Sequence, residues 1–170
     1  MPEQTPIVER LRHVVERELA WLEDDGYAQV DATELRSSVR LSYASERGRI
    51  SVTADAGRGE VEIWLAPPDP GDPRAEIDFL RERPRVMLQA LIAAHELRVP
   101  SGRWDKSEHA DAVVAAYVGA LRELRDRELA GDWSGLDDAK SRARAAMNDE
   151  IERIRDPQLR DLMRRYRSRS

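Results

Sequence analysis

The sequence predicts an α+β fold in which an N-terminal helix packs on a three-stranded antiparallel meander and a helical C-terminal lobe follows. Three observations predict this class. Residues 6–25 place apolar side chains at helical spacing, residues 39–65 alternate apolar and polar side chains in three runs, and helical spacing returns after residue 74.

The length and the proline content predict how the chain is divided. A chain of 170 residues with 41% hydrophobic residues can bury one core, so we expect a single domain over residues 1–170. Four prolines within residues 67–73 cannot continue a sheet ladder, and they mark a boundary between two lobes. The first lobe, residues 1–66, holds the helix and the sheet, and the second, residues 74–170, is helical.

The first helix has a clear start and end. Thr5 can cap it, and Pro6 suits the first helical position because its missing N–H is not needed there. Gly26 follows two aspartates and suits a left-handed helix cap. We therefore expect a helix over residues 6–25, with an apolar stripe formed by Ile7, Leu11, Val14, Val15, Leu19 and Leu22.

Three runs with a period of two residues predict the meander. Short connections that contain glycine separate them, as hairpins require. Residues 27–30 could add a short fourth strand. Helix 6–25 is expected to cover the apolar face of the sheet, and the three runs are residues 39–43, 50–54 and 61–65.

The opposite face of this sheet carries the first candidate binding residues. Alternation places Trp64 on the face away from its apolar neighbours, together with Arg40 and Glu62. A large aromatic side chain among charged residues is a common contact anchor, so these three residues form a candidate partner-binding surface. The alternative is that a later helix covers this face and buries Trp64.

The second lobe reads as helices interrupted by turn residues. Asp105 with Glu108 fits a capping box, and Ser134 with Asp137 fits a second helix start. We expect the fifth helix to bury Met147 along with its other apolar residues. The expected helices are residues 74–82, 84–97, 105–131, 134–154 and a last helix from Pro157, with Leu159, Leu162, Met163 and Tyr166 on one side.

No motif in the sequence indicates catalysis or a bound metal. The absence of cysteine excludes disulfides, zinc–thiolate sites and cysteine nucleophiles. His95-Glu96 lacks a second histidine four residues after His95, so the zinc-protease helix motif is absent. His13 lies between Glu9 and Glu16 at helical spacing, a trio that could hold a metal, although a solvated charged face has the same pattern. We expect no enzyme activity, no cofactor and no metal.

The N-terminus and the hydropathy predict location. Residues 1–4 are polar and lack the features of a signal peptide, and no run approaches about 18 apolar residues. A cytoplasmic protein without membrane segments is expected.

Charge is segregated along the chain. Residues 153–170 hold seven arginines and two aspartates, a net charge of +5, whereas the preceding residues carry −10. Such a basic end could bind phosphates, complement a helix C-terminus through its dipole, or dock on the chain's own acidic body. The candidate binding residues here are Arg160, Arg164, Arg165 and Arg167.

Five short segments resemble small uncharacterised actinobacterial proteins, some of which are similar to immunity proteins of polymorphic toxin systems. The segments are Leu22–Tyr27, Ser37–Tyr43 and Glu60–Leu65 near the front, and Leu121–Glu123 and Leu129–Trp133 near the end. The resemblance covers about half of the chain and supplies no catalytic residues. The opening helix and meander are also similar to bacterial secretion chaperones at the level of the fold.

These observations together predict a non-catalytic cytoplasmic protein-binding module, with an immunity-type toxin neutraliser as its sharpest form. The acidic body suits a basic protein as the partner. One alternative is a nucleic-acid-associated regulator that uses the arginine-rich C-terminal helix, and another is a secretion-chaperone-like protein.

Overall fold

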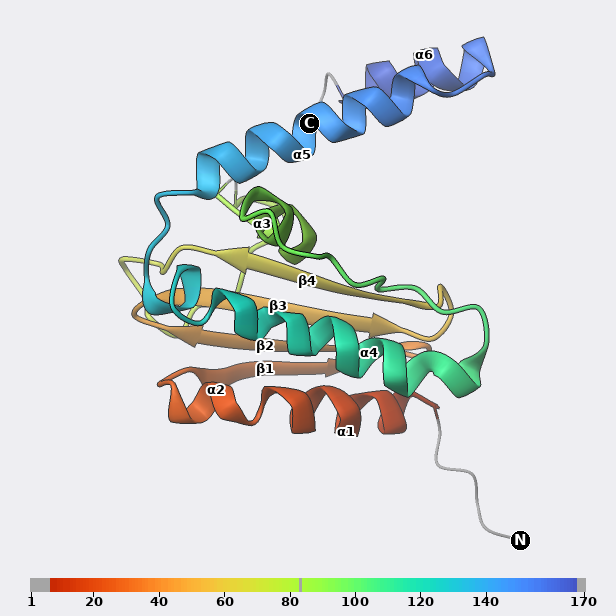
Figure 1. Cartoon of the computed structure of the whole chain (residues 1–170). Coiled ribbons are helices and arrows are strands. Elements are labelled where there is room, and N and C mark those ends of the chain that lie inside the picture. Colours follow the sequence, from red (N-terminus) through yellow and green to blue (C-terminus); the bar gives the residue numbers. More distant parts are fainter. Residues whose placement is uncertain (1–6, 83, 168–170) are drawn as a thin grey trace, which may run out of the picture.

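The computed structural model describes residues 7–82 and 84–167 of the chain. It confirms an α+β fold with an N-terminal helix, an antiparallel sheet and C-terminal helices (Figure 1). The elements in chain order are α1 (Ile7–Leu19), α2 (Trp21–Asp24), β1 (Ala28–Glu34), β2 (Ser38–Ser45), β3 (Gly48–Asp55), β4 (Glu60–Ala66), β5 (Val86–Met87), α3 (Leu88–Ala94), η1 (Ser107–His109), α4 (Ala110–Gly119), η2 (Ala120–Leu124), η3 (Glu128–Ala130), α5 (Leu136–Glu152) and α6 (Pro157–Arg167).

The sheet has five strands where three were expected. The strands follow one another in the order β1-β2-β3-β4-β5, and every neighbouring pair is antiparallel. β2, β3 and β4 form the expected meander, and β1 supplies the additional strand considered at residues 27–30. β5 was missed because its two residues, which pair with Trp64 and Leu65, are too short to show alternation.

The turn between β3 and β4 depends on Gly59. Its φ of +65° lies in the left-handed region, and a Cβ there would lie 2.5 Å from the backbone oxygen of Trp104. The N–H of Trp104 donates to the oxygen of Gly59 at 2.8 Å. Residues far apart in sequence are thus held at this end of the sheet.

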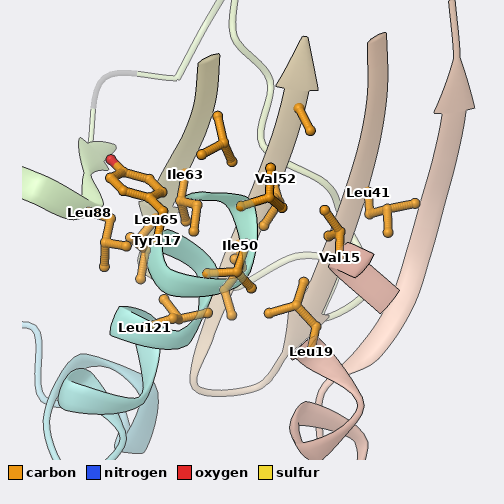
Figure 2. Close-up of a cluster of buried hydrophobic side chains, with 14 of the residues drawn as sticks. Val15, Leu19, Leu41, Ile50, Val52, Ile63, Leu65, Leu88, Tyr117 and Leu121 are labelled. Atoms are coloured by element: carbon orange, nitrogen blue, oxygen red, sulfur yellow. The ribbon is translucent and has the colours of Figure 1, made fainter. Parts of the chain in front are cut away.

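The core lies on the apolar face of the sheet. α1 and α4 cover this face side by side, as Figure 1 shows. The core lies on this face because side chains alternate along a strand, and every second side chain of β2, β3 and β4 points toward these helices. Each buried leucine or isoleucine contributes about 1.5–3 kcal/mol by leaving water. The central side chains in Figure 2 are Val15, Leu19, Leu41, Ile50, Val52, Ile63, Leu65, Leu88, Tyr117 and Leu121.

Residues 67–85, which we call the strap, contain no helix or strand among the described positions, so the helix expected at 74–82 does not form. The aspartates of the strap compete with a helix by bonding their own backbone. The Oδ1 of Asp78 accepts from the N–H groups of Leu80 and Arg81, and the Oδ1 of Asp69 accepts from that of Gly71.

The following helices are shorter than expected. The helix expected at 84–97 is split into β5 and α3, because the strand pairing uses its first residues and Glu96 takes a left-handed φ of 60° after α3. The helix expected at 105–131 is broken into η1, α4, η2 and η3. Its expected capping box is absent, since Lys106 is the N-cap and no side chain bonds the first turn.

α5 and α6 form a helical hairpin that extends beyond the sheet (Figure 1). We call residues 136–167 the arm and the described residues before them the body. The root of the arm packs on α3 and buries Leu136 and Ala139. Met147, expected to be buried, is 53% exposed because the arm has already left the body at that point.

Candidate functional site

α6 is amphipathic, yet its apolar stripe faces solvent. Leu159, Leu162, Met163 and Tyr166 follow helical spacing and would form the buried side of an ordinary surface helix. They are instead 47%, 61%, 38% and 73% exposed, respectively, and no residue of α6 is buried. Five of the eight large apolar side chains exposed in the described chain lie on the arm, these four and Met147.

α6 contacts α5 through its arginine side. The guanidinium of Arg164 donates to the carboxylate of Glu152, with Nε 3.0 Å and Nη2 2.7 Å from Oε1. Arg160 and Arg167 lie four residues before and three after Arg164, so they share its side of the helix, and both are half-buried. The arginine bonds lower the pKa of Glu152 below its ordinary value, and the carboxylate raises the pKa of Arg164.

Two polar atoms at this helix contact are buried without a hydrogen bond among the described residues. They are the Oδ1 of Asn148, one turn before Glu152 on α5, and the Nε of Arg160 on α6. A buried polar group left unpaired costs about 1–3 kcal/mol. The contact between α6 and α5 therefore includes polar groups that are incompletely satisfied, beside the buried side chain of Ile151 in the last turn of α5.

The segment that leads into the arm is held on the rest of the body by polar contacts. The indole Nε1 of Trp133 donates to the oxygen of Arg47 at 2.7 Å. The Nε2 of His95 lies 2.8 Å from Oε1 of Glu128, whose side chain is 1% exposed. Asp132 accepts bonds from the hydroxyl and the N–H of Ser134, and these bonds lower its pKa. The helix start expected at Ser134 is therefore displaced: Ser134 bonds Asp132, and the N-cap of α5 is the next residue, Gly135.

The three sheet candidates lie beneath the strap. Trp64 is half-buried, its ring meets that of Phe79 edge-on at 6.1 Å, and the guanidinium of Arg85 lies 5.1 Å from its centroid. Arg40 forms ion pairs with Asp31 on β1 at 3.6 Å and with the strap. Glu62 is half-buried between the neighbouring strands. A strap, and not the helix considered as the alternative, covers this face.

Sequence reasoning places Arg49 on the face of Trp64 but does not identify it as a residue that fixes the strap. Arg49 forms an ion pair with Glu82, both nearly buried, and donates to the oxygen of Pro67 at 2.8 Å. Beneath the strap, the hydroxyls of Ser42 and Ser51 are buried without a partner among the described residues. Alternation signals that Arg49 is on this face, but no pattern identifies an acidic partner 33 residues away.

The structure thus separates the two sets of candidates. Arg40, Glu62 and Trp64 lie on the polar face of the sheet, and Arg160, Arg164, Arg165 and Arg167 lie on α6. Arg164 bonds within the arm, to Glu152 and Asp161.

A charged groove lies beside α1. It has a volume of about 480 Å³ and includes the trio considered for a metal, Glu9, His13 and Glu16. Arg12 donates to Glu16 at 2.8 Å and to Glu34 at 2.6 Å, which engages both carboxylates. In residues 7–82 and 84–167, no three histidine or acidic side chains gather as metal ligands.

Within residues 7–82 and 84–167, no helix is long and apolar enough to cross a membrane.

Comparison with known proteins yields no relative. No family model matches the chain, and no curated protein and no solved structure is significantly similar to it.

Proposed function

We propose that this protein is a non-catalytic module that acts by binding other protein molecules and that its arm is a contact surface. The solvent-facing apolar stripe of α6 carries the proposal. A contiguous apolar surface exposed to water is costly, and in monomeric proteins such patches mark sites of association. The stripe also has the spacing with which a helix enters a groove of a partner.

A protein partner accounts for the stripe better than nucleic acid does. Phosphate contacts would use the arginines and leave Leu162 and Tyr166 in water. Arg164 is already engaged by Glu152, and the residues before Arg153 carry a net charge of −10, which repels a polyanion. A nucleic-acid-associated regulator remains the alternative function, supported by the arginine content of α6.

The sharper form of the proposal is an immunity-type toxin neutraliser in the cytoplasm. It is supported by the resemblance of the five short segments to small actinobacterial proteins, some of which are similar to immunity proteins, and by the acidic residues before Arg153, which suit a basic toxin. In this form the body contacts the toxin, and the arm supplies a second surface.

Site-specific photocrosslinking in the source organism tests the general proposal. A photoreactive phenylalanine analogue replaces Tyr166, which is 73% exposed, and the matched control replaces Leu80, which is 97% exposed on the strap. We expect protein adducts from position 166 that position 80 does not form. Equal background at both positions would contradict the proposal, and adducts with nucleic acid from position 166 would favour the alternative.

A further inference from the structure

We propose that the occupant of the α6 stripe is a second copy of this chain, so that two arms pack against each other and join two bodies. This inference rests on the proposed function, because it names the partner of the same surface.

The body offers the stripe no apolar surface on which to fold back. α1 and α4 cover the apolar face of the sheet, and the strap covers the other face. The large apolar side chains that the body exposes are Leu35, Leu80 and Val99, which are scattered in sequence. The matching surface in a second copy is therefore its arm, and an interface that uses the same surface twice is the commonest form of homodimer.

The inner contact of the hairpin leaves the stripe free for such pairing. α6 bonds α5 through Arg164, while Leu162 and Tyr166, the members of the stripe farthest around the helix from the arginine side, are 61% and 73% exposed. α6 has 11 residues and is about 16 Å long, and Met147 adds an exposed apolar side chain on α5. Two hairpins that bury these surfaces would form a four-helix arrangement.

The charges of the two helices are complementary between copies. α6 carries four arginines against one aspartate, whereas the last turn of α5 carries Asp149, Glu150 and Glu152. Glu150 lies three residues after Met147, so it is beside the exposed apolar side chain. A two-fold arrangement that places α6 of one copy on α5 of the other brings apolar groups and opposite charges together, whereas α6 on α6 would oppose arginines.

Other occupants satisfy the stripe less well. An anionic lipid surface attracts the arginines, but it repels the acidic residues that precede them. An unrelated protein with an apolar groove would satisfy the stripe, and it becomes the explanation if the chain does not self-associate.

Sedimentation equilibrium of the full chain tests the inference. We expect the wild-type chain to approach twice the monomer mass as its concentration rises. Leu162→Glu introduces a charge twice into the interface and should weaken dimerisation by about 100-fold or more. Leu80→Glu makes the same change on an exposed strap residue and should leave the dimer unchanged. Circular dichroism and thermal unfolding of both variants check that the body stays folded.

Two results would overturn the inference. A wild-type chain that stays monomeric up to about 100 μM would lack the association expected of a stable homodimer. A dimer that Leu162→Glu leaves intact would place the interface elsewhere. The crosslinking experiment remains informative in both cases, since adducts with a different protein at Tyr166 would support the proposed function while the second copy is rejected.

Discussion

α1 and α6 share one pattern of apolar residues and have opposite environments. In α1, Leu11, Val14 and Val15 occupy positions with the same spacing as Leu159, Leu162 and Met163 in α6. The three α1 side chains are at most 5% exposed, whereas the three α6 side chains are 38–61% exposed. The pattern alone therefore specifies which side of a helix is apolar and leaves open what covers that side.

The difference arises from what each helix meets. α1 precedes the meander and packs on β2, β3 and α4, which complete one core with it. α6 meets no such surface, because α1 and α4 cover one face of the sheet and the strap covers the other. The apolar side chains of α1 are therefore buried in the core, whereas those of α6 stay exposed within the described chain.

A matched pair of leucine truncations gives the largest expected difference between body and arm. Leu121→Ala removes a side chain that is 0% exposed and should lower the free energy of unfolding by about 2–5 kcal/mol through lost burial and a cavity. Leu162→Ala, at 61% exposure, should change it by less than about 0.5 kcal/mol at concentrations where the chain is monomeric. Urea unfolding measures both, and similar losses would mean that α6 is part of the core.

The ion pair of the strap tests whether the second face of the sheet is firmly covered. Arg49→Ala leaves Glu82 nearly buried without its partner, and we expect a loss of about 3 kcal/mol in the free energy of unfolding. Arg103→Ala is the control, because its side chain is 83% exposed and its pair with Glu60 should contribute less than about 1 kcal/mol. If the two variants unfold alike, the strap is not held by this pair.

Alkaline titration gives a smaller effect that is confined to the body. Burial raises the pKa of Tyr43 from 10.0 to about 12, so the fold favours the neutral phenol. The stability contributed by this preference is complete below pH 10 and is lost as the pH rises through about 12. Tyr43→Phe should reduce that alkaline loss, as urea unfolding across this range would show. If the variant lost as much stability at alkaline pH as the wild-type chain, Tyr43 would have the same pKa in the folded and the unfolded protein.

The smallest effect is expected in the arm at acid pH. Arg164 lowers the pKa of Glu152 below 4.5, so the contact between α5 and α6 is stabilised above that pH and weakens as the pH falls through the lowered value. We expect faster amide exchange in α6 on acidification while β3 stays protected. Glu152→Gln should remove most of this pH dependence. Equal acid sensitivity of α6 in the variant would show that another group is responsible.

The sequence predicts the sheet well because strands and hairpins are specified by residues that are close together in the sequence. The period of two residues locates β2, β3 and β4, and the connections at Gly48 and Gly59 give their hairpins. The strap is where prediction fails. Residues 74–82 have helical spacing, but the bonds of Asp78 to its own backbone and the contacts of Phe79 and Glu82 with the sheet outweigh it.

The candidate site was predictable only in part. The sequence identifies the apolar and arginine sides of α6, and it lists Arg160, Arg164, Arg165 and Arg167 as candidates. It does not tell which side meets α5, because that choice depends on the partner Glu152 and on the direction in which the arm leaves the body. Exposure of Leu162 and Tyr166 therefore emerges from the structure alone.

The way α5 leaves the body also determines how motion is transmitted. Its N-terminal part packs on α3 and β5, while the whole helix has 17 residues, a length of about 25 Å. A rotation of about 10° at Leu136 would move the far end by about 4 Å, given that length. Small rearrangements where α5 joins the body would therefore be amplified at the tip, and they would change the distance between the body and a molecule bound there.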